Sequence, residues 1–239
     1  MFKKCLAAFA ALMVCAGQTA AYENREETPT TRWDSGAEIV WRYSELEQPA
    51  GISTEDAVTV LIAATRRWEK VVPVRFKFAG VTRETMEASE KCSAVSPVVI
   101  GWGSGHPKYP NMAAFARPCA GKSDASRIVG GTIEFTATKP ELSTSPTRLG
   151  TLDVIATHEI GHLLGLEHSN DPDSIMRPKL EEAQGNHIKG ELSSRDMAVA
   201  AVLYKAGMPE LGGEDWRDMY AAAPEDIKVR FRAALIPAR

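Results

Sequence analysis

The stretch T-H-E-I-G-H-L-L-G-L-E-H-S at residues 157–169 decides how the rest of the chain is interpreted. On an α-helix, residues four apart project from the same face, so His158 and His162 point the same way. Two imidazole nitrogens at this spacing can reach one zinc ion at about 2.0–2.1 Å. Glu159 lies about 100° round the helix from His158. It is therefore placed beside the ligands, where it can take a proton from a metal-bound water.

A third histidine follows at an offset that suits the same ion. Gly165 can adopt the left-handed backbone conformation that ends a helix, so the chain can turn back and let His168 supply a third nitrogen. Three protein ligands leave the fourth tetrahedral position to water, which is typical of a catalytic zinc site. A polar helix face can produce H-E-x-x-H by chance. However, three of the chain's five histidines lie within residues 158–168, which favours the metal site.

Residues 173–178, D-S-I-M-R-P, place a methionine where it can close a tight turn beneath the metal. With this turn the chain resembles the metzincins, and within them the matrixins, whose pattern is H-E-x-x-H-x-x-G-x-x-H-S followed by a methionine turn ending in M-x-P. The resemblance spans about residues 32–206. Arg177 stands where matrixins usually carry tyrosine. The resemblance implies three zinc ligands, a general base and a turn methionine at His158, His162, His168, Glu159 and Met176.

The resemblance also implies an α+β, zincin-like fold: a twisted mixed sheet of about five strands with long helices, and a zinc cleft between an upper part and a smaller lower part. Residue patterns agree with it. Apolar alternation, a short apolar run and helical spacing predict strands near 38–43, 74–78 and 98–100 and a helix near 53–68. Residues 151–153 are expected to cap the zinc helix, and residues 192–204 resemble the last helix of the matrixin catalytic domain.

Residues 112–118, M-A-A-F-A-R-P, resemble the matrixin edge strand that lies above the zinc. An exposed edge offers unpaired N–H and C=O groups that can hold an extended peptide by strand addition. We therefore expect Ala113, Ala114 and Phe115 to bind substrate, since small side chains let a backbone approach closely. The alternative is an edge strand without a binding role.

A second metal site is not expected. His106 lies where matrixins carry a structural zinc and calcium loop, but the family's aspartate-rich continuation is absent. Residues 131–136, G-T-I-E-F-T, resemble the family's G-D-x-H-F-D strand with every metal-binding position changed. A structural zinc is therefore unlikely, and calcium stays open. The glycine-rich residues 101–107 lack the lysine and spacing of a phosphate loop, which argues against nucleotide binding.

The N-terminal segment indicates export. Residues 1–21 have two lysines, an apolar run and a small-residue cleavage site, which is typical of a signal peptide. The apolar run is too short to span a bilayer, so no stable membrane anchor is expected. Residues 22–31 read as a flexible leader, residues 32–206 as the matrixin-like catalytic domain and residues 207–239 as a helical extension. The predicted location is secreted, extracellular or periplasmic.

Two cysteines remain after the signal peptide, Cys92 and Cys119. In an exported protein we expect them to form a disulfide. Closing this loop would stabilise the fold by about 3–4 kcal/mol on the chain-entropy account. Two buried free thiols are the alternative. The chain has no basic block and no interleaved aromatic and basic residues, so nucleic acid is not expected as a partner.

These observations together predict an exported zinc endopeptidase whose metal-activated water attacks a peptide bond, with Glu159 as general base. Two other classes stay open. The chain could be a catalytically silent zinc-containing binding or adhesion module, or a zinc hydrolase of a non-peptide substrate. The oligomeric state is not indicated by the sequence.

Overall fold

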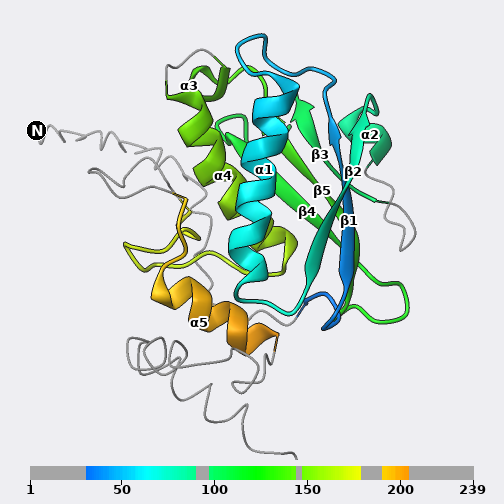
Figure 1. Cartoon of the computed structure of the whole chain (residues 1–239), viewed down its shortest axis with the longest axis vertical. Helices are drawn as coiled ribbons and strands as arrows, with labels where there is room; N and C mark the ends of the chain where they lie inside the picture. Colours follow the sequence, from blue (N-terminus) through cyan, green and yellow to red (C-terminus); the bar gives the residue numbers. More distant parts are fainter. Residues whose placement is uncertain (1–30, 90–96, 144–146, 179–189, 205–239) are drawn as a thin grey trace, which may run out of the picture.

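A single five-stranded sheet organises the protein, with strand order β2-β1-β3-β5-β4. The computed structural model describes residues 31–89, 97–143, 147–178 and 190–204. The strands are β1 (Glu38–Ser44), β2 (Arg75–Thr82), β3 (Val98–Gly103), β4 (Ala114–Ala120) and β5 (Ile128–Thr136). The helices are α1 (Thr54–Glu69), α2 (Met86–Ser89), α3 (Pro140–Ser143), α4 (Arg148–Leu163) and α5 (Ser194–Leu203), arranged as in Figure 1.

The sheet is mixed, as predicted. β1 runs parallel to β2 and β3, and β3 runs parallel to β5. β4 is antiparallel to β5 and lies at the edge of the sheet. The predicted five-stranded α+β architecture is therefore confirmed, including the edge position of the strand expected near residues 112–118.

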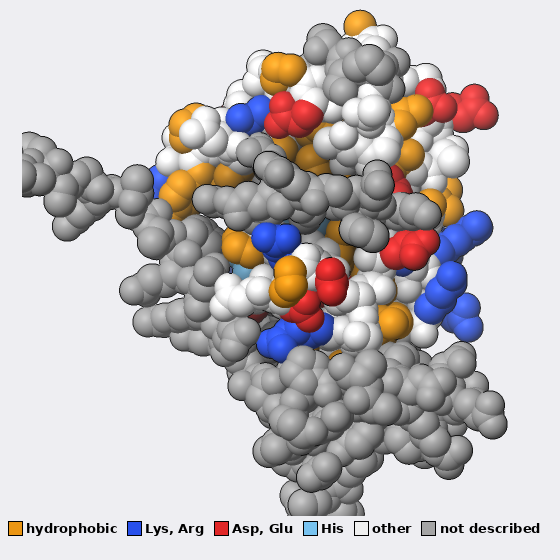
Figure 2. Space-filling model, turned by 90° about the vertical axis from the view of Figure 1, so that its left-hand side faces the viewer, with side chains coloured by type: hydrophobic (Ala, Val, Ile, Leu, Met, Phe, Trp, Pro, Cys, Tyr) orange, Lys and Arg blue, Asp and Glu red, His pale blue; other side chains and the backbone are white. Residues whose placement is uncertain are grey.

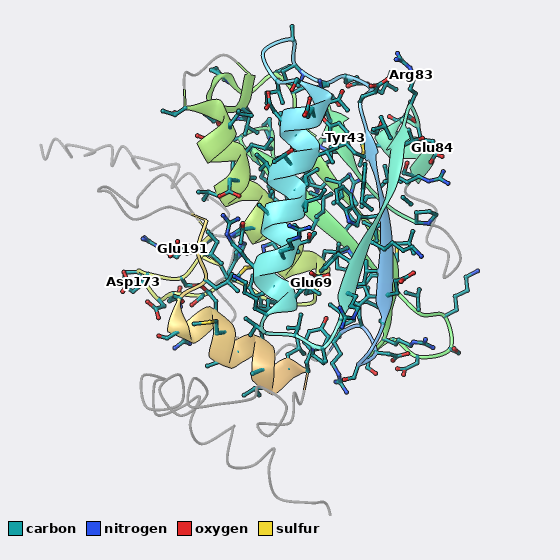
Figure 3. The ribbon with its side chains drawn as sticks, in the orientation of Figure 1. Tyr43, Glu69, Arg83, Glu84, Asp173 and Glu191 are labelled. Atoms are coloured by element: carbon teal, nitrogen blue, oxygen red, sulfur yellow. The ribbon has the colours of Figure 1, made fainter. Side chains whose placement is uncertain are left out.

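The alternation that predicted β1 also explains which face of the sheet is buried. Side chains two apart in a strand point to one face, and Ile39, Trp41 and Tyr43 are at most 1% exposed. Tyr43 is among the side chains labelled in Figure 3, where it lies beside α1. Its hydroxyl accepts a hydrogen bond from Trp102 Nε1 at 2.6 Å and donates one to Gln48 Oε1 at 2.5 Å. The polar atoms of two buried rings are thereby satisfied.

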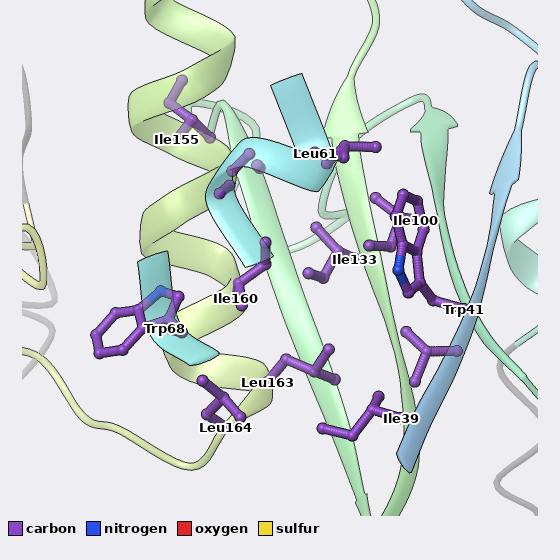
Figure 4. Packing of buried hydrophobic residues seen from close by; sticks show 14 of the residues in the cluster. Ile39, Trp41, Leu61, Trp68, Ile100, Ile133, Ile155, Ile160, Leu163 and Leu164 are labelled. Atoms are coloured by element: carbon purple, nitrogen blue, oxygen red, sulfur yellow. The ribbon is translucent and has the colours of Figure 1, made fainter. Parts of the chain in front are cut away.

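Helices α1 and α4 lie side by side against one face of the sheet (Figure 1). The N-cap Ser53 accepts a hydrogen bond from Asp56 N at 3.0 Å, which starts α1 where the sequence predicted. The core between helices and sheet contains apolar side chains from every layer, as Figure 4 shows. These include Trp41, Leu61, Ile100, Ile133, Ile155 and Ile160.

Two polar contacts join the last turn of α1 to the middle of α4. The Arg67 guanidinium binds both carboxylate oxygens of Asp153, with Nη1–Oδ1 at 2.6 Å and Nη2–Oδ2 at 2.9 Å. One residue along α1, Trp68 Nε1 donates to the Thr157 carbonyl at 2.8 Å. Because a forked guanidinium–carboxylate pair has a single favourable geometry, it sets the register of the two helices.

The predicted start of α4 is wrong. The helix begins at Arg148 after Thr147, which makes no side-chain capping hydrogen bond. Residues 151–153, expected to cap it, lie inside its first turns. Asp153 is used for the bond to Arg67 instead, so a residue type that favours caps has a tertiary role here.

The end of α4 is a Schellman motif built on Gly165. Leu166 N donates to Gly161 O at 3.0 Å and Gly165 N donates to His162 O at 2.9 Å, with Gly165 at φ 96°. Two aromatic side chains satisfy the next carbonyls. Trp33 Nε1 donates to Leu163 O at 2.9 Å, and Tyr204 OH donates to Leu164 O at 2.9 Å.

Several predicted segments lie outside the described residues. These are the signal peptide at 1–21, the leader at 22–31 except its last residue, and the helical extension at 207–239. The predicted last helix is confirmed as α5, which Ser193 caps. Within the described part of the chain, no helix combines the length and apolar character needed to cross a membrane.

Replacing Gly165 with alanine should lower the free energy of unfolding by about 2 kcal/mol or more. An alanine would need the left-handed conformation, and its Cβ would lie 1.9 Å from the carbonyl oxygen of Thr31. Gly150 is the matched control. It lies in the first turn of α4, where an added Cβ would have no atom within 4 Å, so Gly150→Ala should stabilise by about 0.5–1 kcal/mol.

Urea unfolding followed by tryptophan fluorescence measures both variants. Similar midpoints for the Gly165 and Gly150 variants would contradict the role assigned to Gly165.

Candidate metal centre

Three histidines converge at the C-terminal end of α4. His162 Nε2 lies 3.0 Å from His158 Nε2 and 3.2 Å from His168 Nε2. For zinc–nitrogen bonds of about 2.0–2.1 Å, two ligand atoms of a tetrahedral site are about 3.3 Å apart. The observed separations are close to that edge length. Among the described residues, this is the one group of histidine, cysteine or acidic side chains arranged to hold a metal ion.

The partners of the other ring nitrogens decide the protonation of two of these histidines. His158 Nδ1 lies 2.7 Å from Ile175 O, and His162 Nδ1 lies 2.8 Å from Leu166 O. A carbonyl can only accept, so each Nδ1 carries the proton and, in a neutral ring, each Nε2 presents a lone pair. Burial lowers the pKa of His158 to about 4 and that of His162 well below its usual range. Both rings are therefore neutral at physiological pH.

Two lone pairs facing each other at 3.0 Å cannot hydrogen-bond, because neither nitrogen carries a proton. They repel unless a cation lies between them. Burial also lowers the pKa of His168, the third residue of the group. The donor set therefore fits a soft-to-borderline cation such as zinc, which neutral imidazole binds well.

The methionine turn lies directly against the metal-binding helix. Met176 is 1% exposed. A Cβ on Gly161 would lie 2.4 Å from Met176 Sδ and 2.9 Å from Trp68 Cζ2, so only glycine fits between them. Met176 O also accepts a hydrogen bond from Ser169 N at 2.8 Å. This bond fastens the turn to the segment that carries His168.

Asp196, in the first turn of α5, holds the same turn from below. Its Oδ1 accepts a hydrogen bond from Ser174 Oγ, and its Oδ2 accepts one from Ile175 N at 2.9 Å. Ile175 in turn supplies the carbonyl that His158 Nδ1 contacts. Sequence reasoning missed Asp196. Its place three residues after Ser193 is typical of a capping box, which the structure contains. That spacing does not indicate that the Asp196 side chain also reaches the methionine turn.

Glu159 is a buried carboxylate next to the histidines, 5% exposed. Burial raises its pKa to about 8, and a hydrogen bond from the Ala116 backbone partly offsets this rise. Its Oε2 atom has no hydrogen-bond partner among the described residues. A buried oxygen of this kind is unfavourable unless a cation, a water or a substrate group satisfies it. The arrangement thus supplies a base beside a metal-binding set.

Strand β4 presents its outer edge on the side of Glu159. Thr136 N donates to Ala113 O at 2.8 Å, so the Ala113 carbonyl faces β5. In an antiparallel pair the orientation alternates, so the peptide groups of Ala114 and Ala116 face the free edge, whereas those of Phe115 face β5. Of the three residues predicted to bind substrate, Ala114 is thus the one whose peptide groups face outward. Their role stays a prediction.

Other residues that the sequence singled out lie outside the three-histidine group. His106 packs its ring against Tyr109 and Phe115, with centroids 4.9 and 5.1 Å away, and its Nδ1 accepts a bond from Lys108 N. Cys119 is buried in β4, but Cys92 lies outside the described residues, so the disulfide stays a prediction. On the face of the molecule drawn in Figure 2, histidine side chains appear only as a small pale blue area.

Comparison with known proteins agrees with this geometry. The profile of the matrixin family matches residues 32–205. Human matrix metalloproteinase-16 is 40% identical over 62 residues, which is 26% of this chain and 10% of that protein. Metalloendoproteinase 1-MMP of Arabidopsis thaliana is 28% identical over 166 residues, 70% of this chain and 43% of the relative. Metalloendoproteinase 5-MMP of the same plant is 30% identical over 165 residues, 65% of this chain and 41% of the relative.

The chain therefore spans less than half the length of each of these relatives. The family profile, in contrast, covers nearly all of the described region, and it includes the sheet, both long helices and the three histidines. On that match, the chain belongs to the matrixin family of metzincins.

Proposed function

We propose that this protein is a zinc-dependent endopeptidase that hydrolyses peptide bonds in extended polypeptides. The observation that carries the proposal is the juxtaposition of three converging imidazoles with an unsatisfied, buried carboxylate oxygen on the same helix. Membership of the matrixin family supports it, since family relatives are named as metalloendoproteinases.

His158, His162 and His168 are the proposed zinc ligands, with Met176 packed beneath them. A zinc ion bound there would polarise the scissile carbonyl and lower the pKa of an attacking water to about 7. The backbone carbonyls of Ile175 and Leu166 keep the two helical imidazoles in the tautomer that leaves Nε2 free. Such hydrogen bonds orient the ligands and raise their basicity.

Glu159 is the proposed general base. Its burial raises the pKa of the carboxyl to about 8, and a zinc ion bound beside it would favour the carboxylate form that accepts the proton. The Ala116 N–H fixes the carboxylate toward β4. From this position Glu159 can take a proton from the attacking water and deliver it to the leaving amine.

Substrate is proposed to bind along the free edge of β4. The outward-facing peptide groups of Ala114, together with the Ala116 carbonyl, can pair with an extended peptide in the way that a new strand joins a sheet. Because Ala116 also contacts Glu159, a peptide on this edge lies next to the base. Backbone pairing of this kind favours polypeptides over small esters or amides, which have no strand to add.

The other two functions have less support. A silent binding module has no need for a buried carboxylate with an unsatisfied oxygen, which is unfavourable for stability. A hydrolase of non-peptide substrates has no need for an edge strand beside the general base. Incubating the zinc-loaded protein with a random peptide mixture and analysing the products by mass spectrometry distinguishes the endopeptidase from both other functions. Only the endopeptidase yields internal cleavage products that disappear when zinc is chelated.

We also propose that the protein is exported to an oxidising compartment. A predicted signal peptide at residues 1–21 would direct the chain out of the cytoplasm, and Cys92 could then pair with Cys119. The proposed location is extracellular or periplasmic.

Replacing Glu159 with glutamine should leave zinc bound but lower kcat by about 10²–10⁴-fold, because the amide cannot accept the proton. Zinc content by elemental analysis and cleavage of an internally quenched peptide measure the two effects. Glu167→Gln is a suitable control, since it makes the same change at an exposed residue nearby in the chain. Substantial turnover in the Glu159 variant would remove this residue from the mechanism.

Substituting His162 with alanine should abolish stoichiometric zinc binding, because His162 contacts both other ligands. The matched control is His106→Ala, which removes a histidine that lies outside the group and should keep one zinc per chain. Metal content after dialysis measures both variants. Loss of zinc in the His106 variant, with retention in the His162 variant, would refute the assignment.

Zinc should be retained into mildly acidic solution. An exposed histidine titrates near pH 6.5, whereas burial lowers the pKa of His158 to about 4. Protons therefore compete for this ligand only as the pH falls toward its lowered value. The unfolded chain binds more protons than the folded one in this range, so metal-free stability should also decrease as the pH falls from 6.5 toward 4. Zinc content after dialysis across this range provides the measurement, and half-loss near pH 6.5 would contradict the prediction.

A further inference from the structure

The face of the sheet opposite α1 and α4 contains a buried carboxylate that the proposed reaction does not use. Ile133 and Phe135 of β5 belong to the core, so Glu134 between them points to the other face. Glu134 is 6% exposed, and burial raises its pKa. A carboxylate in such a place is unfavourable unless it makes compensating contacts. Its contacts therefore indicate what it does.

Glycines in and after β3 make room for this side chain. A Cβ on Gly103 would lie 2.4 Å from Glu134 Oε1 and 2.6 Å from its Cδ. Gly101 is the direct partner of Glu134 across the β3–β5 pair. Gly105, at φ 92°, donates its backbone N–H to Glu134 Oε1 at 3.0 Å. The glycine-rich segment thus accommodates one carboxylate, which then holds the start of the loop that follows β3.

Thr136, two residues further along β5, holds the end of the same loop. Its Oγ1 donates to Met112 O at 2.9 Å, and its backbone N donates to Ala113 O at 2.8 Å. The side chains of Glu134 and Thr136 share one face of β5. Together they fix both ends of the loop at residues 104–113, and the next residue, Ala114, begins strand β4.

We propose that Glu134 is a positioning residue, which sets the place of the substrate-binding edge of β4 by anchoring residues 104–113 through Gly105. The proposal rests on the peptidase function proposed above. Few residues would carry the effect from Glu134 to the general base. The anchored loop leads into Ala114, and Ala116 in the same strand contacts Glu159. If the anchor at Gly105 is lost, only the contacts of Thr136 to Met112 and Ala113 still hold the loop before β4, while α4 keeps its own contacts to α1.

The kinetic test compares Glu134→Ala with Glu134→Gln in the full-length, zinc-loaded protein. A glutamine oxygen can still accept the Gly105 N–H, so Glu134→Gln should keep KM for a long peptide within about twofold of wild type. Glu134→Ala should raise KM about tenfold with kcat and zinc content nearly unchanged, because it weakens ground-state binding along the edge. Glu38→Gln, an exposed change on β1, is the control and should behave as wild type.

Hydrogen exchange measured by mass spectrometry gives a readout that does not need turnover. In Glu134→Ala, residues 104–117 should lose protection while α1 and α4 keep theirs, and Glu134→Gln should stay protected. If the wild-type protein cleaves no peptide, the proposed function fails, and the exchange data still decide the role of Glu134. Unchanged exchange in the alanine variant, or a glutamine variant impaired as strongly as alanine, would overturn the proposal.

Gly103→Ala supplies an independent test that keeps Glu134 and serves even where Glu134→Ala fails to fold. Its Cβ would displace the carboxylate from the Gly105 N–H. The variant should therefore raise KM and expose residues 104–117 to exchange in the same way as Glu134→Ala. A Gly103→Ala variant with wild-type KM and wild-type exchange would overturn the proposal.

Discussion

The fixed approach of two unprotonated ring nitrogens, His158 Nε2 and His162 Nε2 at 3.0 Å, is the constraint on which the rest of the structure depends. In water such rings would turn apart or take up protons. Here their Nδ1 atoms are tied to the carbonyls of Ile175 and Leu166, and burial opposes protonation. The fold thus directs two lone pairs toward one point, where a single cation could bind both without rearrangement of the rings.

Holding the rings in place requires support on several sides of α4. On one side, Trp68 of α1 binds the carbonyl of Thr157, the residue before the first histidine. At the C-terminal end, Trp33 and Tyr204 bind the last carbonyls of the helix. Below, Asp196 fixes the turn that faces His158. These residues come from separate parts of the chain, so the geometry of the site depends on the whole domain being folded.

The parts of this arrangement that the sequence predicted are those that local spacing encodes. The histidine spacing, the glycine after the helix and the alternation in β1 each reflect a repeat of a few residues, and each is visible without tertiary structure. Contacts between positions far apart in the chain produce no such pattern in the sequence. Asp196 reaches Ile175 across 21 residues and Arg67 reaches Asp153 across 86, so neither pairing could be inferred. The wrong start predicted for α4 has the same origin, because residues 151–153 have the composition of a cap whereas the partner of Asp153 lies in α1.

Strand β5 shows how one element can serve the core and the edge strand β4 separately. Its inward residues Ile133 and Phe135 pack beneath the helices, whereas its outward residues Glu134 and Thr136 hold the loop that leads to β4. Because alternate side chains face opposite sides, the two sets share no direct contact across the sheet. The packing beneath the histidine-bearing helix and the hold on the loop before β4 therefore come from opposite faces of the same strand.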